Sequence, residues 1–136
     1  MAFSPKARIG DNFRSSGSLH ISALQSIEIG DDCLLGSNIY IADHSHGRYR
    51  AGVQSRPDQA PSSRELGAVG PVVIGASCWI GNNVITLGDV TIGAGAVIAA
   101  NSVVLHDIPA GVIAIGTPAR AAKRFDAKSS SWTRLP

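Results

Sequence analysis

The chain has 136 residues, with 12 Lys and Arg against 10 Asp and Glu and a formal net charge of +2. This length suits a single domain, and the nearly balanced charge leaves no basic face able to neutralise a run of phosphates, so nucleic acid is not expected as a partner. No apolar run approaches the ~20 residues that span a bilayer, and the N-terminus lacks the apolar core of a signal peptide, which together predict a cytoplasmic protein with no membrane span.

An aliphatic residue returns at every sixth position along most of the chain. The spacing is faint from Ile9, clear over residues 29–41, and clear again over residues 74–104, where only Thr86 departs. In the last block a small or β-branched residue stands four positions after each leading residue, at Cys78, Val84, Val90, Ala96 and Ser102. A period of six fits neither the 3.6 residues of a helical turn nor the simple alternation of one strand.

Gly, Asn and Asp collect between the aliphatic positions, as in the stretches IGDD from Ile29 and IGNN from Ile80. These residue types favour tight corners. The pattern therefore predicts short strands separated by corners, three strands to a coil, with the leading aliphatic side chains pointing inward. Stacked coils bury one continuous aliphatic ladder, so each repeat is stabilised chiefly by its neighbours.

With these hexads the chain resembles the hexapeptide-repeat acyltransferases, and most closely the branch that O-acetylates galactosides, maltose and polysaccharides. The resemblance covers about residues 9–125. It implies an all-β fold, a left-handed parallel β-helix, whose hand rests on the resemblance alone because parallel crossovers are generally right-handed. We expect one domain over residues 1–125, with a short C-terminal helix of good helix formers at 119–125, followed by a flexible tail at 126–136.

The repeat stops between about residues 47 and 71, where the sequence is rich in Arg, Gly, Ser and Pro. A structureless segment of this length inside a compact solenoid is uncommon and usually functional. The hexads restart cleanly at GPVVIG, so the loop is expected to leave the wall of the solenoid and return to it. In the family such a loop reaches toward a neighbouring subunit and helps to wall the active site, which implies a homotrimer with sites between subunits.

Two histidines stand at the entrance to this loop, in the sequence ADHSHG. An HxH pair by itself is more often a pair of polar residues than a site, but an imidazole can take the proton of a sugar hydroxyl that attacks a thioester. In the resembling sugar acetyltransferases, the histidine after the same run of repeats is the general base, and the ungapped match places it at His46. His44 is then a substrate contact or an orienting group, and Asp43 is a further candidate to orient an imidazole.

The acceptor side of the expected site departs from the family. Where resembling enzymes often have an asparagine that binds the acceptor hydroxyl, the ungapped match gives Ser16. The identity of the acceptor therefore stays open. Arginines in the loop, Arg48 among them, favour a polar or anionic glycan or a nucleotide-linked sugar, although single arginines of this kind are more often simply solvated.

The later coils resemble the family's groove for acetyl-CoA. Small side chains at Ala99 and Ala100 would let the pantetheine arm lie along the wall of the solenoid. Trp79 suits stacking on the ligand and packing against a neighbouring subunit equally well. We therefore expect acetyl-CoA as the acyl donor.

The run GTPARAAKRF resembles the turn on which family members seat the nucleotide of the donor. Its matching positions are Thr117, Pro118 and Arg120. Lys123 and Arg124 suit the 3′-phosphate of acetyl-CoA, because cations bind phosphate oxygens. The same cations equally suit a solvated helix C-terminus.

Together these features predict an acetyl-CoA-dependent O-acetyltransferase acting on a sugar or polysaccharide precursor. N-acetylation of an amino sugar or an antibiotic is an alternative that the fold serves equally well. A γ-type carbonic anhydrase and a non-catalytic trimeric solenoid are two further alternatives. The former needs three histidines for its zinc, and the later coils lack the extra pair, so no metal is expected. Cys33 and Cys78 have no CxxC spacing and are expected to be packed, reduced thiols.

Overall fold

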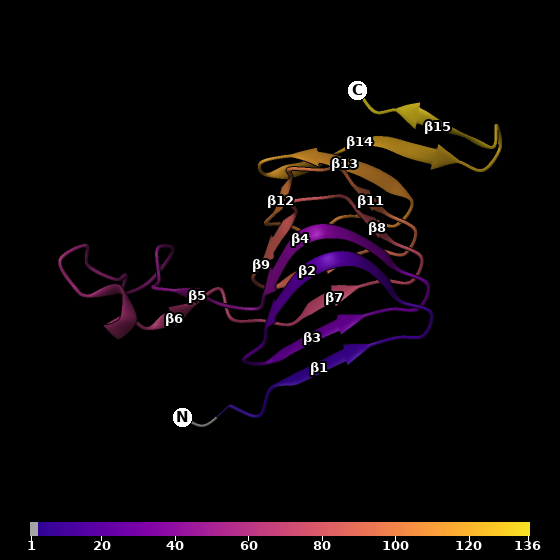
Figure 1. Cartoon of the computed structure of the whole chain (residues 1–136). Coiled ribbons are helices and arrows are strands. Elements are labelled where there is room, and N and C mark those ends of the chain that lie inside the picture. Colours follow the sequence, from indigo (N-terminus) through magenta and orange to yellow (C-terminus); the bar gives the residue numbers. More distant parts are fainter. Residues whose placement is uncertain (1–2) are drawn as a thin grey trace.

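The computed structural model describes residues 3–136 as a solenoid of coils stacked along one axis (Figure 1). Its strands are β1 (Lys6–Ile9), β2 (Arg14–Ser22), β3 (Ser26–Ile29), β4 (Leu34–Ala42), β5 (Ser45–His46), β6 (Leu66–Gly67), β7 (Val72–Ile74), β8 (Trp79–Ile80), β9 (Ile85–Leu87), β10 (Val90–Ile92), β11 (Val97–Ile98), β12 (Val103–Val104), β13 (Val112–Gly116), β14 (Ala119–Asp126) and β15 (Ser131–Arg134). A single 3₁₀ turn, η1 (Pro61–Ser63), is the one helical element in the described part of the chain.

The coils form three walls of parallel strands. The first wall is the sheet β1-β3-β7-β10. β2 and β4 are long enough to turn a corner, so the first half of β4 pairs with β8 in the second wall and its second half pairs with β9 in the third. β11 and β13 continue the second wall, and β12 continues the third. This arrangement confirms the left-handed parallel β-helix.

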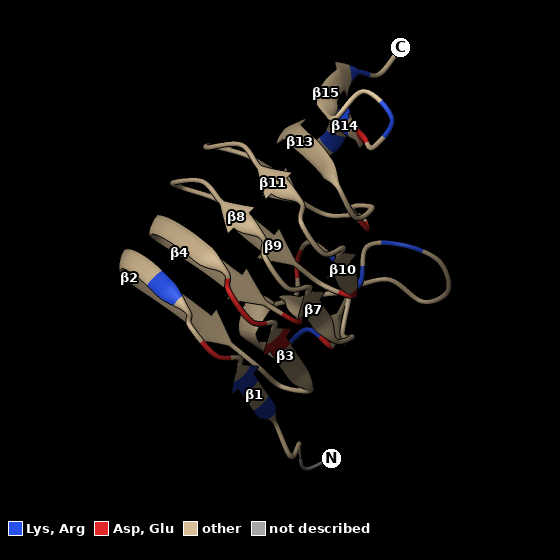
Figure 2. Ribbon diagram, turned by 90° about the vertical axis from the view of Figure 1, so that its right-hand side faces the viewer, with Lys and Arg blue, Asp and Glu red and all other residues tan. Residues whose placement is uncertain are grey.

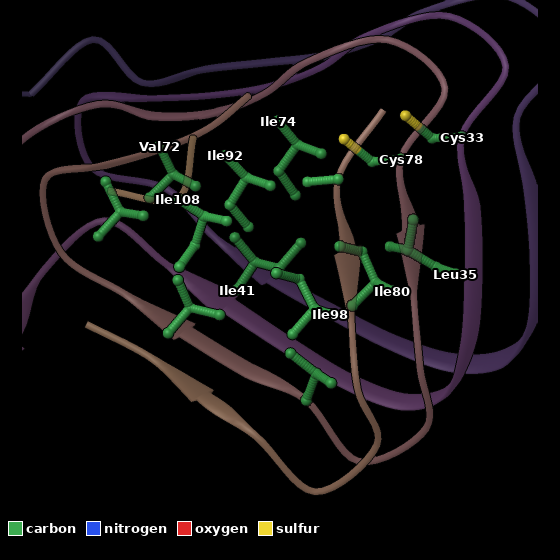
Figure 3. Close-up of a cluster of buried hydrophobic side chains, with 14 of the residues drawn as sticks. Cys33, Leu35, Ile41, Val72, Ile74, Cys78, Ile80, Ile92, Ile98 and Ile108 are labelled. Carbon is green, nitrogen blue, oxygen red and sulfur yellow. The ribbon is translucent and has the colours of Figure 1, made fainter. Parts of the chain in front are cut away.

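The residues inside the three walls are the aliphatic positions of the hexads. All six leading positions from Ile74 to Val104, Thr86 included, are at most 1% exposed, and so are the five positions that follow them by four residues. Figure 3 shows Ile92 of the first wall, Ile80 of the second and Ile41 of the third meeting in this interior. Burial of one such side chain stabilises the fold by roughly 1.5–3 kcal/mol, so the ladder contributes substantially to the stability.

Over much of the solenoid, the coils differ in length at one corner only. Val72 lies opposite Val90, a step of 18 residues or three hexads, whereas Lys6 lies opposite Ser26, a step of 20. The two extra residues fall between β2 and β3, where residues 23–26 take the place that residues 88–89 take between β9 and β10. Residues 43–71 occupy the same corner between β4 and β7. We call this corner, formed by residues 23–26, 43–71 and 88–89, the loop corner.

The long loop leaves the solenoid at the loop corner and returns to it, as expected, and Figure 1 shows it projecting from the wall. At its base β5 and β6 pair antiparallel, with Ser45 opposite Gly67 and His46 opposite Leu66. The pairing of β3 with β7 places Ile27 opposite Val72, so the wall resumes in register after the loop. The insertion therefore changes the corner without disturbing the stack of coils.

The expected C-terminal helix at residues 119–125 is wrong, because these residues form β14. β14 turns back at Thr117–Pro118 and pairs antiparallel with β13, which would otherwise be an unpaired edge at the end of the solenoid. Helix propensities differ by less than ~1 kcal/mol per residue, too little to outweigh the pairing that satisfies the edge of β13. In place of the expected tail, β15 pairs with β14. None of the helical structure in residues 3–136 has the length and apolarity to cross a bilayer.

We predict that Ile92→Ala lowers the free energy of unfolding by about 2–5 kcal/mol, because it empties part of the interior ladder. Ile92 is fully buried. The matched control is Thr91→Ala on the same strand, an exposed position where the change should stay within about 0.5 kcal/mol. Equilibrium unfolding in urea measures both, and equal effects of the two substitutions would contradict the inward assignment of the hexad positions.

Candidate functional site

A pocket of about 590 Å³ opens at the loop corner, between the base of the long loop and the coils that follow it. From the loop it is lined by Ser45, Gly47 and Tyr49, and from the coils by Leu87 and Leu105. The lining thus combines apolar side chains from the coils with loop backbone and polar side chains. An elongated ligand with apolar segments suits such a space.

Asp43 is the best-held polar residue of the loop corner. Its side chain is fully buried, and its two oxygens accept hydrogen bonds from the N–H groups of Leu24 at 2.8 Å, Gln25 at 2.7 Å and Ser26 at 2.9 Å. Nδ1 of His44 lies 2.9 Å from Oδ1 of the same carboxylate. The carboxylate thus ties the entrance of the loop to the same corner of the preceding coil.

The environment of Asp43 keeps its carboxylate charged. Burial by itself raises the pKa of Asp43, but hydrogen bonds from the Leu24 N–H, from His44 and from the Gln25 and Ser26 N–H groups outweigh that effect. The pKa of Asp43 therefore lies below its ordinary value of 3.8. A charged acceptor that receives several N–H donors is the usual cause of such a shift.

His46 and His44 are neighbours with different surroundings. The side chain of His44 is only 13% exposed and contacts Asp43, whereas His46 on β5 is exposed and its imidazole makes no hydrogen bond within residues 3–136. The two ring centroids are 6.4 Å apart and the rings are nearly perpendicular. The backbone of His46 is fixed by Tyr49, whose hydroxyl donates to the His46 carbonyl at 2.6 Å. The structure thus brings together the two histidines and the aspartate that the sequence singled out.

The loop arginines differ in whether other loop residues already hold their side chains. Arg56 forms a bidentate ion pair with Asp58, and Arg64 donates to loop carbonyls and to the hydroxyl of Tyr49. Arg48, a predicted substrate contact, lines the pocket and lies 3.4 Å from exposed Glu65, a weak ion pair at most. Arg48 and Arg50, which also lines the pocket, are therefore the loop arginines best placed to meet a ligand.

Ser16 does not join this group within one chain. It lies on exposed β2 between Ser15, which pairs with Leu35, and Gly17, which pairs with Ser37. That register places Ser16 at the corner between the second and third walls, a strand away from the loop corner. Any joint action of Ser16 with the histidines would require a second subunit.

The residues expected on the donor side lie on the second wall and beyond it. Trp79 on β8 is 54% exposed. Ala99 and Ala100 follow β11 at the corner of the second and third walls, and Thr117 and Pro118 form the turn between β13 and β14. They follow one another along the solenoid, but in one chain the structure does not bring them to the histidines.

The basic side chains of β14 lie on both faces of the strand. Arg120 pairs with Ile115 and Lys123 with Ile113, both on the outer side of β13, whereas Arg124 pairs with buried Val112. Cross-strand partners share a face of a sheet. Arg120 and Lys123 therefore lie on the outer face of the wall, and Arg124 does not lie with them.

The cysteines are packed as the sequence predicted. Cys33 and Cys78 are both free and buried. Burial raises the pKa of the Cys78 thiol to about 11, so this thiol stays protonated at neutral pH and is a poor nucleophile. Across residues 3–136, no three His, Cys, Asp or Glu side chains gather as a possible metal site.

Two features of the site could not be predicted from the sequence. The three main-chain N–H groups that hold Asp43 come from the coil before it, and their only trace in the sequence is the two-residue slip of the hexads near Ile27. Tyr49, which links the His46 carbonyl to Arg64, lies in a loop without any repeat. No pattern in the sequence indicates that contact.

Two family models match the chain. A bacterial transferase hexapeptide model of six repeats matches residues 71–106, and a model of the hexapeptide repeat of succinyl-transferase matches residues 19–42. Both matched segments are walls of the solenoid, on either side of the long loop.

The chain is also similar to named proteins of this class. It is 36% identical over 125 residues to WbbJ of Escherichia coli (strain K12), which carries the provisional name lipopolysaccharide biosynthesis O-acetyl transferase; the match covers 91% of this chain but 63% of WbbJ. A maltose O-acetyltransferase structure from Clostridium difficile 630 is 30% identical, with a TM-score of 0.72, over 90% of this chain and 67% of that one. A hexapeptide-repeat-containing acetyltransferase from Vibrio cholerae O1 biovar eltor, complexed with acetyl coenzyme A, is 34% identical, with a TM-score of 0.74, over 88% and 61%.

Parallel coils of three hexads, interrupted by one loop with histidines at its entrance, define a hexapeptide-repeat solenoid. Taken with the sequence and structural matches, this shows that the chain belongs to the hexapeptide-repeat transferase family. It spans less than two thirds of the length of WbbJ.

We predict that Asp43→Asn lowers the free energy of unfolding at pH 7 by at least about 2 kcal/mol, because three main-chain N–H groups lose a charged acceptor. The pKa of Asp43 is lower in the folded state, so its contribution is present above pH 3.8 and is lost as the pH falls below that value. The stability gap between the wild type and the variant should therefore begin to narrow at about pH 4 and go on narrowing toward about pH 3.

Thermal unfolding across this pH range checks the result. The exposed Asp11→Asn is the matched control and should show no such gap. A gap for Asp43→Asn that stays constant down to pH 3 would contradict the charged state assigned to the carboxylate.

Proposed function

We propose that the protein is an acetyl-CoA-dependent O-acetyltransferase that moves an acetyl group to a hydroxyl of a sugar or polysaccharide precursor. The observation that carries the proposal is His46, an exposed imidazole at the entrance of the loop, with its backbone fixed by β5 and Tyr49. The relatives named as O-acetyltransferases support hydroxyl acceptors, and the Vibrio cholerae complex supports acetyl-CoA as the donor.

His46 acts as the general base in this proposal. Its imidazole takes the proton of the acceptor hydroxyl while the oxygen forms a bond to the thioester carbonyl carbon. The resulting oxyanion needs a donor such as a main-chain N–H at a corner of a facing coil. When the oxyanion collapses, the C–S bond breaks and the imidazolium returns its proton to the departing thiolate. No oxidant, reductant or metal takes part.

The donor side of the proposal uses the second wall. The small residues Ala99 and Ala100 leave room for a pantetheine arm beside the wall, and the exposed ring of Trp79 could stack on the ligand. At the end of the solenoid, the turn Thr117–Pro118 would seat the nucleotide. Arg120 and Lys123 share the outer face there and suit its phosphates.

A homotrimer with sites between subunits is part of this proposal. Register places Leu34, Trp79, Val97 and Ile113 side by side on the outside of the second wall, and Leu34 and Trp79 are 44% and 54% exposed. Figure 2 shows β4, β8, β11 and β13 free of charged residues, with blue on β2 and β14 at either end. Such an apolar face suits a second copy of the chain. Ser16 would then contact acceptor bound at a neighbouring loop corner.

We predict that His46→Ala lowers kcat for acetyl transfer by at least about 100-fold and leaves the affinity for acetyl-CoA within about twofold, because a general base acts on the acceptor and not on donor binding. Thiol release measures turnover, and calorimetric titration measures donor affinity. His20→Ala is the matched control, since His20 is an exposed histidine whose ring stacks on Tyr40 of the neighbouring strand. Unchanged turnover in His46→Ala would remove the role of base from this residue.

We also predict that Lys123→Glu weakens acetyl-CoA binding at least about tenfold, while Arg124→Glu weakens it less than about threefold. The reason is that Lys123 shares the outer face with Arg120, whereas Arg124 lies on the other face of β14. Calorimetric titration with acetyl-CoA compares the two adjacent variants. Equal losses of affinity would mean that general charge, and not the outer face, attracts the donor.

A further inference from the structure

Asp43 and His44 form a polar pair that is anchored chiefly to the preceding coil of the solenoid. The carboxylate of Asp43 is held by the N–H groups of residues 24–26 in the preceding coil. The main chain of Asp43 is held as well, because its N–H donates to the Ser22 carbonyl at 3.3 Å and its own carbonyl accepts from the Gly70 N–H at 3.1 Å. His44 therefore starts from one of the most constrained backbone positions at this corner.

The hydrogen bonds of Asp43 determine which nitrogen of His44 carries the proton. An ionised carboxylate only accepts hydrogen bonds and has about four acceptor positions. Main-chain N–H groups fill three of them, and the remaining contact is Nδ1 of His44 at 2.9 Å, which must therefore be a donor. A neutral imidazole with its proton on Nδ1 has a bare Nε2 that can only accept.

Within residues 3–136 the imidazole of His46 has no such partner, and the two imidazoles therefore suit different tasks. The nearly perpendicular rings lie with their centroids 6.4 Å apart, close enough to contact one small acceptor together. In its neutral form His44 offers a fixed acceptor nitrogen, whereas the imidazole of His46 is exposed and makes no hydrogen bond with any described residue. A buried or half-buried acceptor nitrogen left without a donor weakens binding, so His44 favours ligands that bring an additional O–H group.

We propose that Nε2 of His44 accepts a hydrogen bond from one hydroxyl of the acceptor while His46 takes the proton from the neighbouring hydroxyl, and that Asp43 is the positioning residue that locks His44 for this contact. The inference rests on the proposed acetyl transfer and adds a substrate class to it. The acceptor is a compound with two adjacent hydroxyl groups, as on a sugar ring. A simple alcohol lacks the second group and is a poor substrate.

The test compares methyl α-D-glucopyranoside with its four monodeoxy derivatives as acceptors. In the wild type, removal of a hydroxyl adjacent to the acetylated position should lower kcat/KM at least about tenfold. In His44→Ala the parent glucoside should lose a similar factor, mainly through KM, and the same deletion should then change kcat/KM less than about twofold, since the partner of that hydroxyl is gone. His44→Gln keeps an acceptor oxygen and should recover part of the preference, and His20→Ala should keep all of it.

Each outcome decides one proposal. Discrimination by His44→Ala equal to that of the wild type overturns the role of His44 and leaves the acetyltransferase proposal intact. Failure of the wild type to transfer acetyl to any of the glycosides or to maltose overturns the acetyl transfer to sugars and this inference with it.

A spectroscopic measurement tests the pair without turnover. Long-range ¹H–¹⁵N correlation of the imidazoles in the wild type should show His44 protonated on Nδ1 and bare on Nε2. In Asp43→Asn the side-chain amide can donate to Nδ1, so the proton should move to Nε2, a change that a merely structural role of Asp43 would not produce. A wild-type spectrum with the His44 proton on Nε2 would overturn the inference.

Discussion

Main-chain hydrogen bonds between stacked coils are the constraint on which the rest of the structure depends. Parallel pairing places each residue beside its counterpart one coil away, so a position that faces inward in one coil faces inward in all of them. The corners obey the same rule. Asn38 donates to Asn83, and Asn83 donates to Asn101, each from a left-handed backbone that asparagine tolerates well. At the corner between β3 and β4, a Cβ on Gly30 would lie 2.7 Å from the main-chain nitrogen of Ala76, so the stack leaves no room for a larger residue.

This constraint explains what could be predicted from the sequence. The inward ladder, the loop and the histidines at its entrance all follow from a period of six and from the point where that period stops. The hexads carry no information on the last coil, because it has no further coil to pair with. There β14 and β15 fold back to cover an edge, and a strand formed where local propensity favoured a helix. The contacts of Asp43 could not be predicted from the sequence either, since its partners lie 17 to 19 residues away in another coil.

The two histidines illustrate how one corner can provide both fixed and adaptable chemistry. His44 receives its geometry from a charged carboxylate that is itself anchored by the wall. His46 receives its geometry from a two-residue strand and a tyrosine of the loop. His44 and His46 are therefore only two residues apart in the sequence, yet the solenoid positions the first imidazole and the inserted loop positions the second. Ser16, a predicted acceptor contact, lies at a different corner of the same chain.

The loop rejoins the wall in the register it left, and this has an evolutionary consequence. Ile27 faces Val72 as Val72 faces Val90, so the coils pack alike whatever length of chain is inserted between them. Closing a loop twice as long costs only about 0.6 kcal/mol more. A lineage can thus lengthen, shorten or replace this segment by small steps without endangering the fold. Descendants of one ancestral solenoid could diverge in what they recognise at this corner while keeping the opposite walls almost unchanged.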